Sequence, residues 1–77
     1  MKQLNIYEEM AKKRDGMSKT QKKIADYILE HQVAVSFYTV GKLAKEANVS
    51  EASVVRFANF LGYDGYSSLQ KQMQENY

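Results

Sequence analysis

The sequence contains no cysteine and no proline, and only four of its 77 residues are glycine. The lack of cysteine excludes a disulfide framework and a thiolate site. The lack of proline and the scarcity of glycine favour uninterrupted helices, because both residues weaken helical segments. No apolar run approaches the roughly 20 residues that a membrane helix needs, and no secretory signal is evident at the N-terminus. These absences favour one small cytoplasmic domain without membrane contact.

The chain also lacks a strong charge of one sign, because 11 basic residues oppose nine acidic ones and the formal net charge is +2. This value is a weak indication of nucleic-acid binding. The distribution of charge along the chain is more informative, since residues 12–45 hold eight basic residues and three acidic ones. Most of these lysines are expected on solvated helix faces, and some of them can face phosphate.

Residues 39–62, TVGKLAKEANVSEASVVRFANFLG, form two amphipathic segments with a short break between them. In each segment apolar residues recur at i, i+3, i+4 and i+7, which places them on one helix face. They are Val40, Leu43, Ala44 and Ala47 in the first segment, and Val54, Phe57, Ala58 and Leu61 in the second. This pattern is typical of a helix-turn-helix, whose second helix enters the major groove of DNA.

Residues at the ends of these segments support the same interpretation. Thr39 and Ser50 can each cap the first turn of a helix. Asn48 stands at the turn, where a positive φ is expected and where Asn is tolerated. Glu51 suits the positive end of the second helix dipole, and Gly62 is a typical left-handed terminator. The recognition helix is therefore predicted over about residues 50–62.

Further helices are predicted on both sides of this unit. Residues 3–14 and a segment from Ser18 to about His31 each begin with a capping-box pattern, and a closing helix begins near Tyr66. Residues 33–37 alternate like a short strand but have no partner strand, so we expect a tight helical turn that delivers Phe37 to the core. The predicted fold is all-α, with a homeodomain-like three-helix core and additional N- and C-terminal helices.

The predicted opening helix carries two neighbouring apolar stripes, formed by Leu4, Ile6, Tyr7 and Met10. This is more apolar surface than packing on one side requires. We therefore expect this helix to make a homodimer, which would place two recognition helices about 34 Å apart on an inverted repeat.

Candidate DNA-contacting residues lie on the face of the second helix opposite its apolar stripe. Ala52 and Val55 can contact thymine methyl groups, Arg56 can pair with guanine or reach phosphate, and Asn59 can read adenine. Glu51 lies on the same face, where a first-turn role is favoured over a contact with cytosine.

Other candidates would contact the DNA backbone. Thr39, Ser50 and Ser53 are hydroxyl residues near helix N-termini, where phosphate binds well. Lys42 and Lys45 on the first helix can flank the backbone. Together with the recognition-helix residues, these give a predicted double-stranded DNA site without a cofactor.

No catalytic or metal site is predicted. The chain has a single histidine, His31, at a predicted helix C-terminus and without a second ligand nearby. The alternative to DNA binding is a helical module that uses a helix-turn-helix fold to bind another protein, because fold alone does not assign function.

The stretch VSEASVVRFANFLGYDGYSSLQ resembles the signature of the RpiR-type regulators, and MSKTQKKIADYILEH looks like the opening helix of that family. The resemblance covers about residues 17–73. It implies one RpiR-type helix-turn-helix domain over residues 1–77 of a bacterial transcriptional regulator of sugar metabolism. It also implies a longer protein, whose C-terminal sugar-isomerase-type domain binds a phosphosugar effector and is absent from this sequence.

The sequence departs from the family pattern at several positions. The family often has Cys and then basic residues after the Phe, whereas Ala58, Asn59 and Phe60 follow here. Asn48 replaces the usual turn Gly, and Lys19 and Gln32 stand where Pro is common. These departures leave the predicted fold unchanged but put the family's base contacts in doubt for this chain.

Overall fold

All the regular secondary structure in residues 5–75, the part that this computed structural model describes, is helical. Six α-helices, one short 3-10 helix and no strand occur within that part. Their bounds are α1 Ile6–Lys13, η1 Arg14–Gly16, α2 Lys19–Glu30, α3 Gln32–Val35, α4 Val40–Ala47, α5 Glu51–Phe60 and α6 Tyr66–Glu75. The predicted all-α class is confirmed for these residues. None of the described helices is long and apolar enough to cross a membrane.

Helices α1 and α2 begin at the predicted capping boxes. The Asn5 side chain accepts a hydrogen bond from the backbone N–H of Glu8 at 2.8 Å, and the Glu8 carboxylate accepts one from Asn5 N–H at 3.1 Å. Ser18 and Gln21 repeat this reciprocal pair at 3.1 and 2.9 Å. Each box satisfies two amides that would otherwise lack partners at the helix start.

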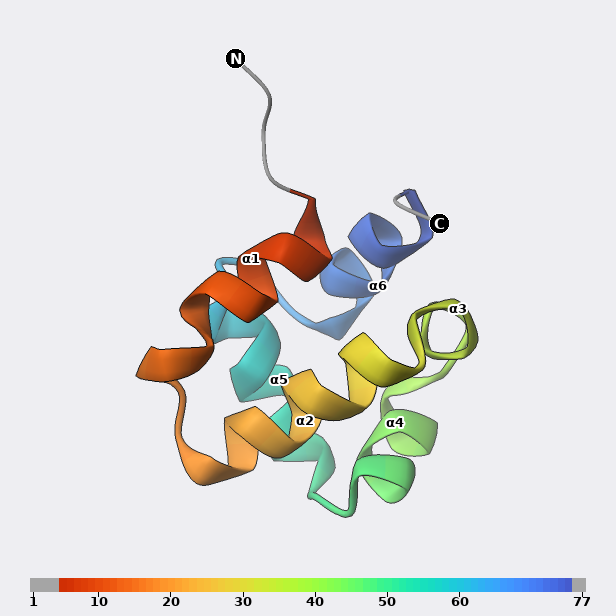
Figure 1. Cartoon of the computed structure of the whole chain (residues 1–77). Coiled ribbons are helices and arrows are strands. Elements are labelled where there is room, and N and C mark those ends of the chain that lie inside the picture. The colour runs from red at the N-terminus through yellow and green to blue at the C-terminus, as the bar shows by residue number, and fades with distance from the viewer. Residues whose placement is uncertain (1–4, 76–77) are drawn as a thin grey trace.

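Helix α2 runs through the middle of the molecule and contacts α1, α3, α4 and α5 (Figure 1). Helices α4 and α5 pack on it to form the three-helix core. Helices α1 and α6 contact each other, and α6 also contacts α5. The N-terminal and C-terminal helices thus support the helix-turn-helix without covering the start of α5.

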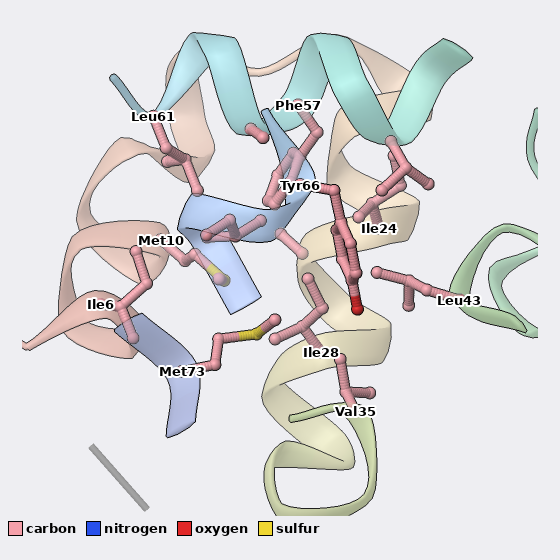
Figure 2. Close-up of a cluster of buried hydrophobic side chains, with 14 of the residues drawn as sticks. Ile6, Met10, Ile24, Ile28, Val35, Leu43, Phe57, Leu61, Tyr66 and Met73 are labelled. Atoms are coloured by element: carbon pink, nitrogen blue, oxygen red, sulfur yellow. The ribbon is translucent and has the colours of Figure 1, made fainter. Parts of the chain in front are cut away.

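Apolar side chains from all six α-helices form one buried cluster (Figure 2). Phe57 of α5, Ile24 of α2 and Leu43 of α4 are fully buried in it. Complete burial of such a side chain contributes about 1.5–3 kcal/mol. The stripes at i, i+3, i+4 and i+7 therefore fix how α4 and α5 sit on α2.

The segment between α2 and α4 forms the predicted helical turn, but the prediction that it delivers Phe37 to the core is wrong. Phe37 is 64% exposed, whereas Val35 and Ser36 are fully buried. The four residues Gln32–Val35 are helical, so their inward positions follow the helical period and not the alternation that links residues 33, 35 and 37. Val35 thereby takes the core position that was expected for Phe37.

Helix α6 fixes the segment that leads into α4. Gln74 Nε2 donates to the Ser36 carbonyl at 2.9 Å, and Gln70 Nε2 donates to the Tyr38 carbonyl at 2.6 Å. The Tyr66 hydroxyl donates to the same Tyr38 carbonyl at 2.6 Å. Burial raises the pKa of Tyr66 to about 12, so this hydroxyl stays protonated at neutral pH and remains a donor.

The apolar stripes of α1 are used inside the chain. Ile6 and Met10 are 2% and 0% exposed, and Tyr7 is 8% exposed with its hydroxyl donating to the Met73 carbonyl at 3.4 Å. Leu4, the fourth residue of the predicted dimer surface, lies outside the described residues. Because these apolar residues are buried within the chain, they no longer support a dimer surface on α1. The homodimer stays a prediction.

Candidate nucleic-acid interface

The turn between α4 and α5 has the predicted backbone geometry. Asn48 has φ 59° and ψ 49°, in the left-handed region, which Asn tolerates better than most residues. Its carbonyl accepts a hydrogen bond from Lys23 Nζ at 3.2 Å. The next residue, Val49, donates its N–H to the Ala44 carbonyl at 2.9 Å. The turn is thereby tied both to α4 and to α2.

Side-chain hydroxyls begin both helices, as predicted. Thr39 Oγ1 accepts from the N–H of Lys42 at 3.1 Å, and Ser50 Oγ accepts from the N–H of Ser53 at 3.1 Å. The hydroxyls of Ser50 and Ser53 also lie 2.9 Å apart, so they share a hydrogen bond. These three hydroxyls, expected to bind phosphate, therefore first serve to cap or order the helix starts.

Helix α5 ends in a backbone motif that the sequence also predicted. Gly62 has φ +97°, its N–H donates to the Asn59 carbonyl at 3.0 Å, and the N–H of Tyr63 donates to the Ala58 carbonyl at 3.0 Å. This pair of bonds is a Schellman motif, which satisfies carbonyls that lack intrahelical partners. Helix α5 is thus fixed at both ends as well as along its buried side.

The outward face of α5 carries the residues predicted to read DNA. The side chains of Glu51, Ala52, Val55, Arg56 and Asn59 are exposed, whereas Ser53 is half-buried. A single α-helix with such a face fits the major groove of B-DNA. The structure therefore brings the five candidates together on one accessible surface.

The departures from the family pattern fall on two different faces of α5. Ala58 is fully buried in the core, so it bears on packing and not on a DNA surface. Asn59 and Phe60 are exposed, the latter by 39%. The basic residues that the family often has are therefore replaced on the accessible face, which makes this face less positive.

The Glu51 carboxylate lies against the first turn of α4. A Cβ atom placed on Gly41 would come within 3.2 Å of Glu51 Oε2, and Thr39 Oγ1 would be 4.0 Å from that Cβ. This region of α4 is the positive end of its dipole. A side chain of α5 thus puts negative charge at the first turn of α4, the helix that Thr39 caps.

Two of the predicted basic contacts differ in how they are held. Lys42 is exposed, lies 3.9 Å from Glu46 in an i,i+4 pair, and sits 5.4 Å above the Tyr38 ring centre. The Arg56 side chain forms no ion pair or hydrogen bond with any other residue between 5 and 75. The charge of Arg56 is therefore available to a ligand without breaking a contact.

Three residues of α2 and its cap join this surface although the sequence gave them no binding role. Ser18, Thr20 and Gln21 line a hollow of about 190 Å³ together with Ser53 and Arg56 of α5. The sequence marked Ser18 and Gln21 as a capping box only. Their position beside Arg56 depends on how α2 packs on α5, which no local pattern reveals.

The described residues show no metal centre, since no group of three or more His, Cys, Asp or Glu side chains among them could hold an ion. His31, the single histidine, stacks near Tyr27 with 4.3 Å between ring centres.

Known proteins similar to this chain include transcriptional regulators. The chain is 40% identical over 60 residues to the uncharacterized HTH-type transcriptional regulator YfhH of Escherichia coli strain K12, covering 78% of this chain and 21% of YfhH. It is 31% identical over 72 residues to the HTH-type transcriptional regulator HexR of Pseudomonas aeruginosa, covering 94% of this chain and 25% of HexR. The chain thus spans a quarter or less of the length of these curated relatives.

A solved structure supports the same relationship. The Vibrio vulnificus NanR protein complexed with ManNAc-6P superposes with a TM-score of 0.91 at 35% identity, covering 94% of this chain and 28% of NanR. The family model described as "Helix-turn-helix domain, rpiR family" matches residues 4–77. This chain therefore belongs to the rpiR family of helix-turn-helix domains, the DNA-binding part of transcriptional regulators.

Proposed function

We propose that this chain reads double-stranded DNA by placing α5 in the major groove, as part of a bacterial regulator of sugar-metabolism genes that acts in the cytoplasm. The observation that carries the proposal is the arrangement of α5. One side of the helix is fully buried through Val54, Phe57 and Ala58, and both of its ends are capped. The opposite side is exposed along its length. A rigid helix with a free face is what groove reading requires.

The residues on that face divide by their chemistry. Ala52 and Val55 offer apolar contacts to thymine methyl groups, and Asn59 offers a bidentate pair to adenine. Thr39, Ser50 and Lys42 lie near helix starts and would contact phosphates. Arg56 has a side chain suited to guanine or to phosphate.

We further propose that the intact regulator is a homodimer whose phosphosugar effector binds a domain other than this one. Support comes from the NanR structure, which holds ManNAc-6P and of which this chain matches 28%. A dimer would read an inverted repeat with half-sites about 34 Å apart. The described part of α1 offers no spare apolar surface for it, so its contacts would be made elsewhere.

Selection of preferred duplexes from a random DNA pool tests the proposed reading of DNA. The wild-type chain should enrich one half-site, or two in an inverted repeat. The variant Ala52→Glu, which places a carboxylate on the proposed groove face, should lose this enrichment. The matched variant Ser67→Glu, at an exposed position of α6, should keep it. Equal enrichment by both variants would contradict groove reading by α5.

The competing function is a protein-binding module, which the partly exposed Val55 and Phe60, at 38% and 39%, favour. The salt dependence of the binding affinity distinguishes DNA binding from protein binding. DNA binding should weaken with salt by a log–log slope of about −0.9 for each phosphate contacted. A slope near zero, together with no enrichment in the selection, would favour the protein-binding function.

A further inference from the structure

A hollow between the start of α2 and the flank of α5 has the lining of an anion site. Its volume is about 190 Å³, well above the roughly 10–15 Å³ that one water needs. Its lining residues are Ser18, Thr20, Gln21, Ser53 and Arg56. All five carry polar side chains, one is a cation and none is acidic. This composition favours a small anionic group with several oxygen atoms.

The donors around the hollow are available. Gln21 Oε1 accepts from the Ser18 N–H at 2.9 Å, which leaves the two N–H groups of its side-chain amide free to donate. The Thr20 hydroxyl and the Arg56 guanidinium have no hydrogen-bond partner among residues 5–75. A guanidinium presents parallel N–H groups that match two oxygens of a phosphate.

The position of the hollow identifies the source of the anion. Ser53 and Arg56 are three residues apart and therefore share one flank of α5, next to the face that carries Ala52 and Val55. When that face lies in the major groove, the flanks of the helix meet the sugar–phosphate strands that border the groove. An anion in the hollow would then be a phosphate of the bound duplex.

We propose that this hollow is a subsite for one DNA backbone phosphate, bound by Arg56 from α5 and by Thr20 and Gln21 from α2. The proposal rests on the proposed function and deepens it in two ways. Arg56 serves as a phosphate ligand and not as a reader of guanine. Helix α2, which carries none of the base-reading residues, takes part in fixing the register of α5 on the duplex.

The test uses fluorescence anisotropy with the 77-residue chain and a duplex enriched from the random pool, together with all its single-base-pair substitutions. Arg56→Ala should weaken binding to every duplex by about 5- to 150-fold, with the ranking of duplexes unchanged and the salt slope smaller by about 0.9. Thr20→Ala should weaken binding by about 2- to 13-fold, with no change in the salt slope. Arg56→Lys keeps the charge but not the paired donors and should fall between wild type and Arg56→Ala.

Replacing single phosphates by neutral methylphosphonates locates the contact. At one backbone position the replacement should weaken wild-type binding, and there Arg56→Ala and Thr20→Ala should cause no further loss. The matched control Ser67→Ala, which removes an exposed hydroxyl from the first turn of α6, should behave as wild type. Circular dichroism melting verifies that each variant is folded.

Two results would overturn the subsite. If Arg56→Ala relaxes preference at one base pair while Thr20→Ala has no effect, Arg56 reads a base and the hollow binds no phosphate. If no single methylphosphonate cancels the effects of both substitutions, the two residues do not share a phosphate. Failure of the proposed function is distinguishable, because the wild-type chain itself would then show no duplex preference and no salt dependence.

Discussion

At the proposed interface, Glu51 places a negative charge where a DNA phosphate would otherwise be favoured. Its carboxylate lies over the first turn of α4, within 3.2 Å of a Cβ placed on Gly41, where the dipole and Thr39 would otherwise favour phosphate. The same charge suits the start of α5, to which Glu51 belongs. Glu51 therefore stabilises the start of α5 and, at the proposed interface, would weaken the attraction for DNA.

Replacing Glu51 by Gln should raise DNA affinity by roughly 0.3–1 kcal/mol at low salt, the usual size of a charge effect at a helix terminus. The gain should shrink as salt rises, because the charge is exposed. Anisotropy titrations at two salt concentrations measure it, with Glu75→Gln at the far end of α6 as the control. Weaker binding to one duplex only would instead make Glu51 a cytosine contact.

At the scale of elements, a paired charge joins η1 to α2. Arg14 Nε and Nη2 donate to the two Asp26 carboxylate oxygens at 2.8 and 2.9 Å. The hydrogen bond to Arg14 lowers the pKa of Asp26 below its usual value. Both side chains are more than 40% exposed, so solvent screening keeps the contribution of the pair to stability small.

Asp26→Asn should therefore lower the free energy of unfolding by this small amount at pH 7. Because the folded-state pKa of Asp26 is depressed, its stabilisation is complete above the unfolded value near 3.9 and is lost as pH falls through the folded value. The deficit of Asp26→Asn should thus be smaller at pH 3 than at pH 7. Urea unfolding at both pH values measures this, with Asp64→Asn in the exposed turn before α6 as the control. An equal deficit at pH 7 and pH 3 would show that the ion pair does not cause it.

Which elements the sequence predicts correctly depends on how far along the chain their contacts reach. The caps at Thr39 and Ser50 and the left-handed turn at Asn48 are confirmed, because each depends on neighbours within four residues. The inward position of Phe37 is wrong, because it depends on how α3 packs against the rest of the core. Thr20 and Arg56 are 36 positions apart in the sequence and line the same hollow. The periodicity within either helix gives no information about this proximity.

At the scale of the whole molecule, the core is small, and the apolar stripes of α1 are needed to complete it. Folded domains are stable by roughly 0.05–0.15 kcal/mol per residue, so a chain of 77 residues has about 4–12 kcal/mol. Met10 and Ile6 of α1 lie in the same cluster as Met73 of α6 (Figure 2). Helix α1 thus helps to close the core, and the fold depends on it.

Met10→Ala should consequently destabilise the folded monomer and not a dimer. Truncation of a fully buried Met costs about 2–5 kcal/mol, a large part of the total. Urea unfolding at several protein concentrations measures this, with Lys12→Ala on the exposed side of α1 as the control. The midpoint of the wild-type chain should not change with concentration, since mass action stabilises only associating chains. A midpoint that rises with concentration in the wild type, together with a Met10→Ala chain that sediments as a folded monomer, would restore α1 as the dimer surface.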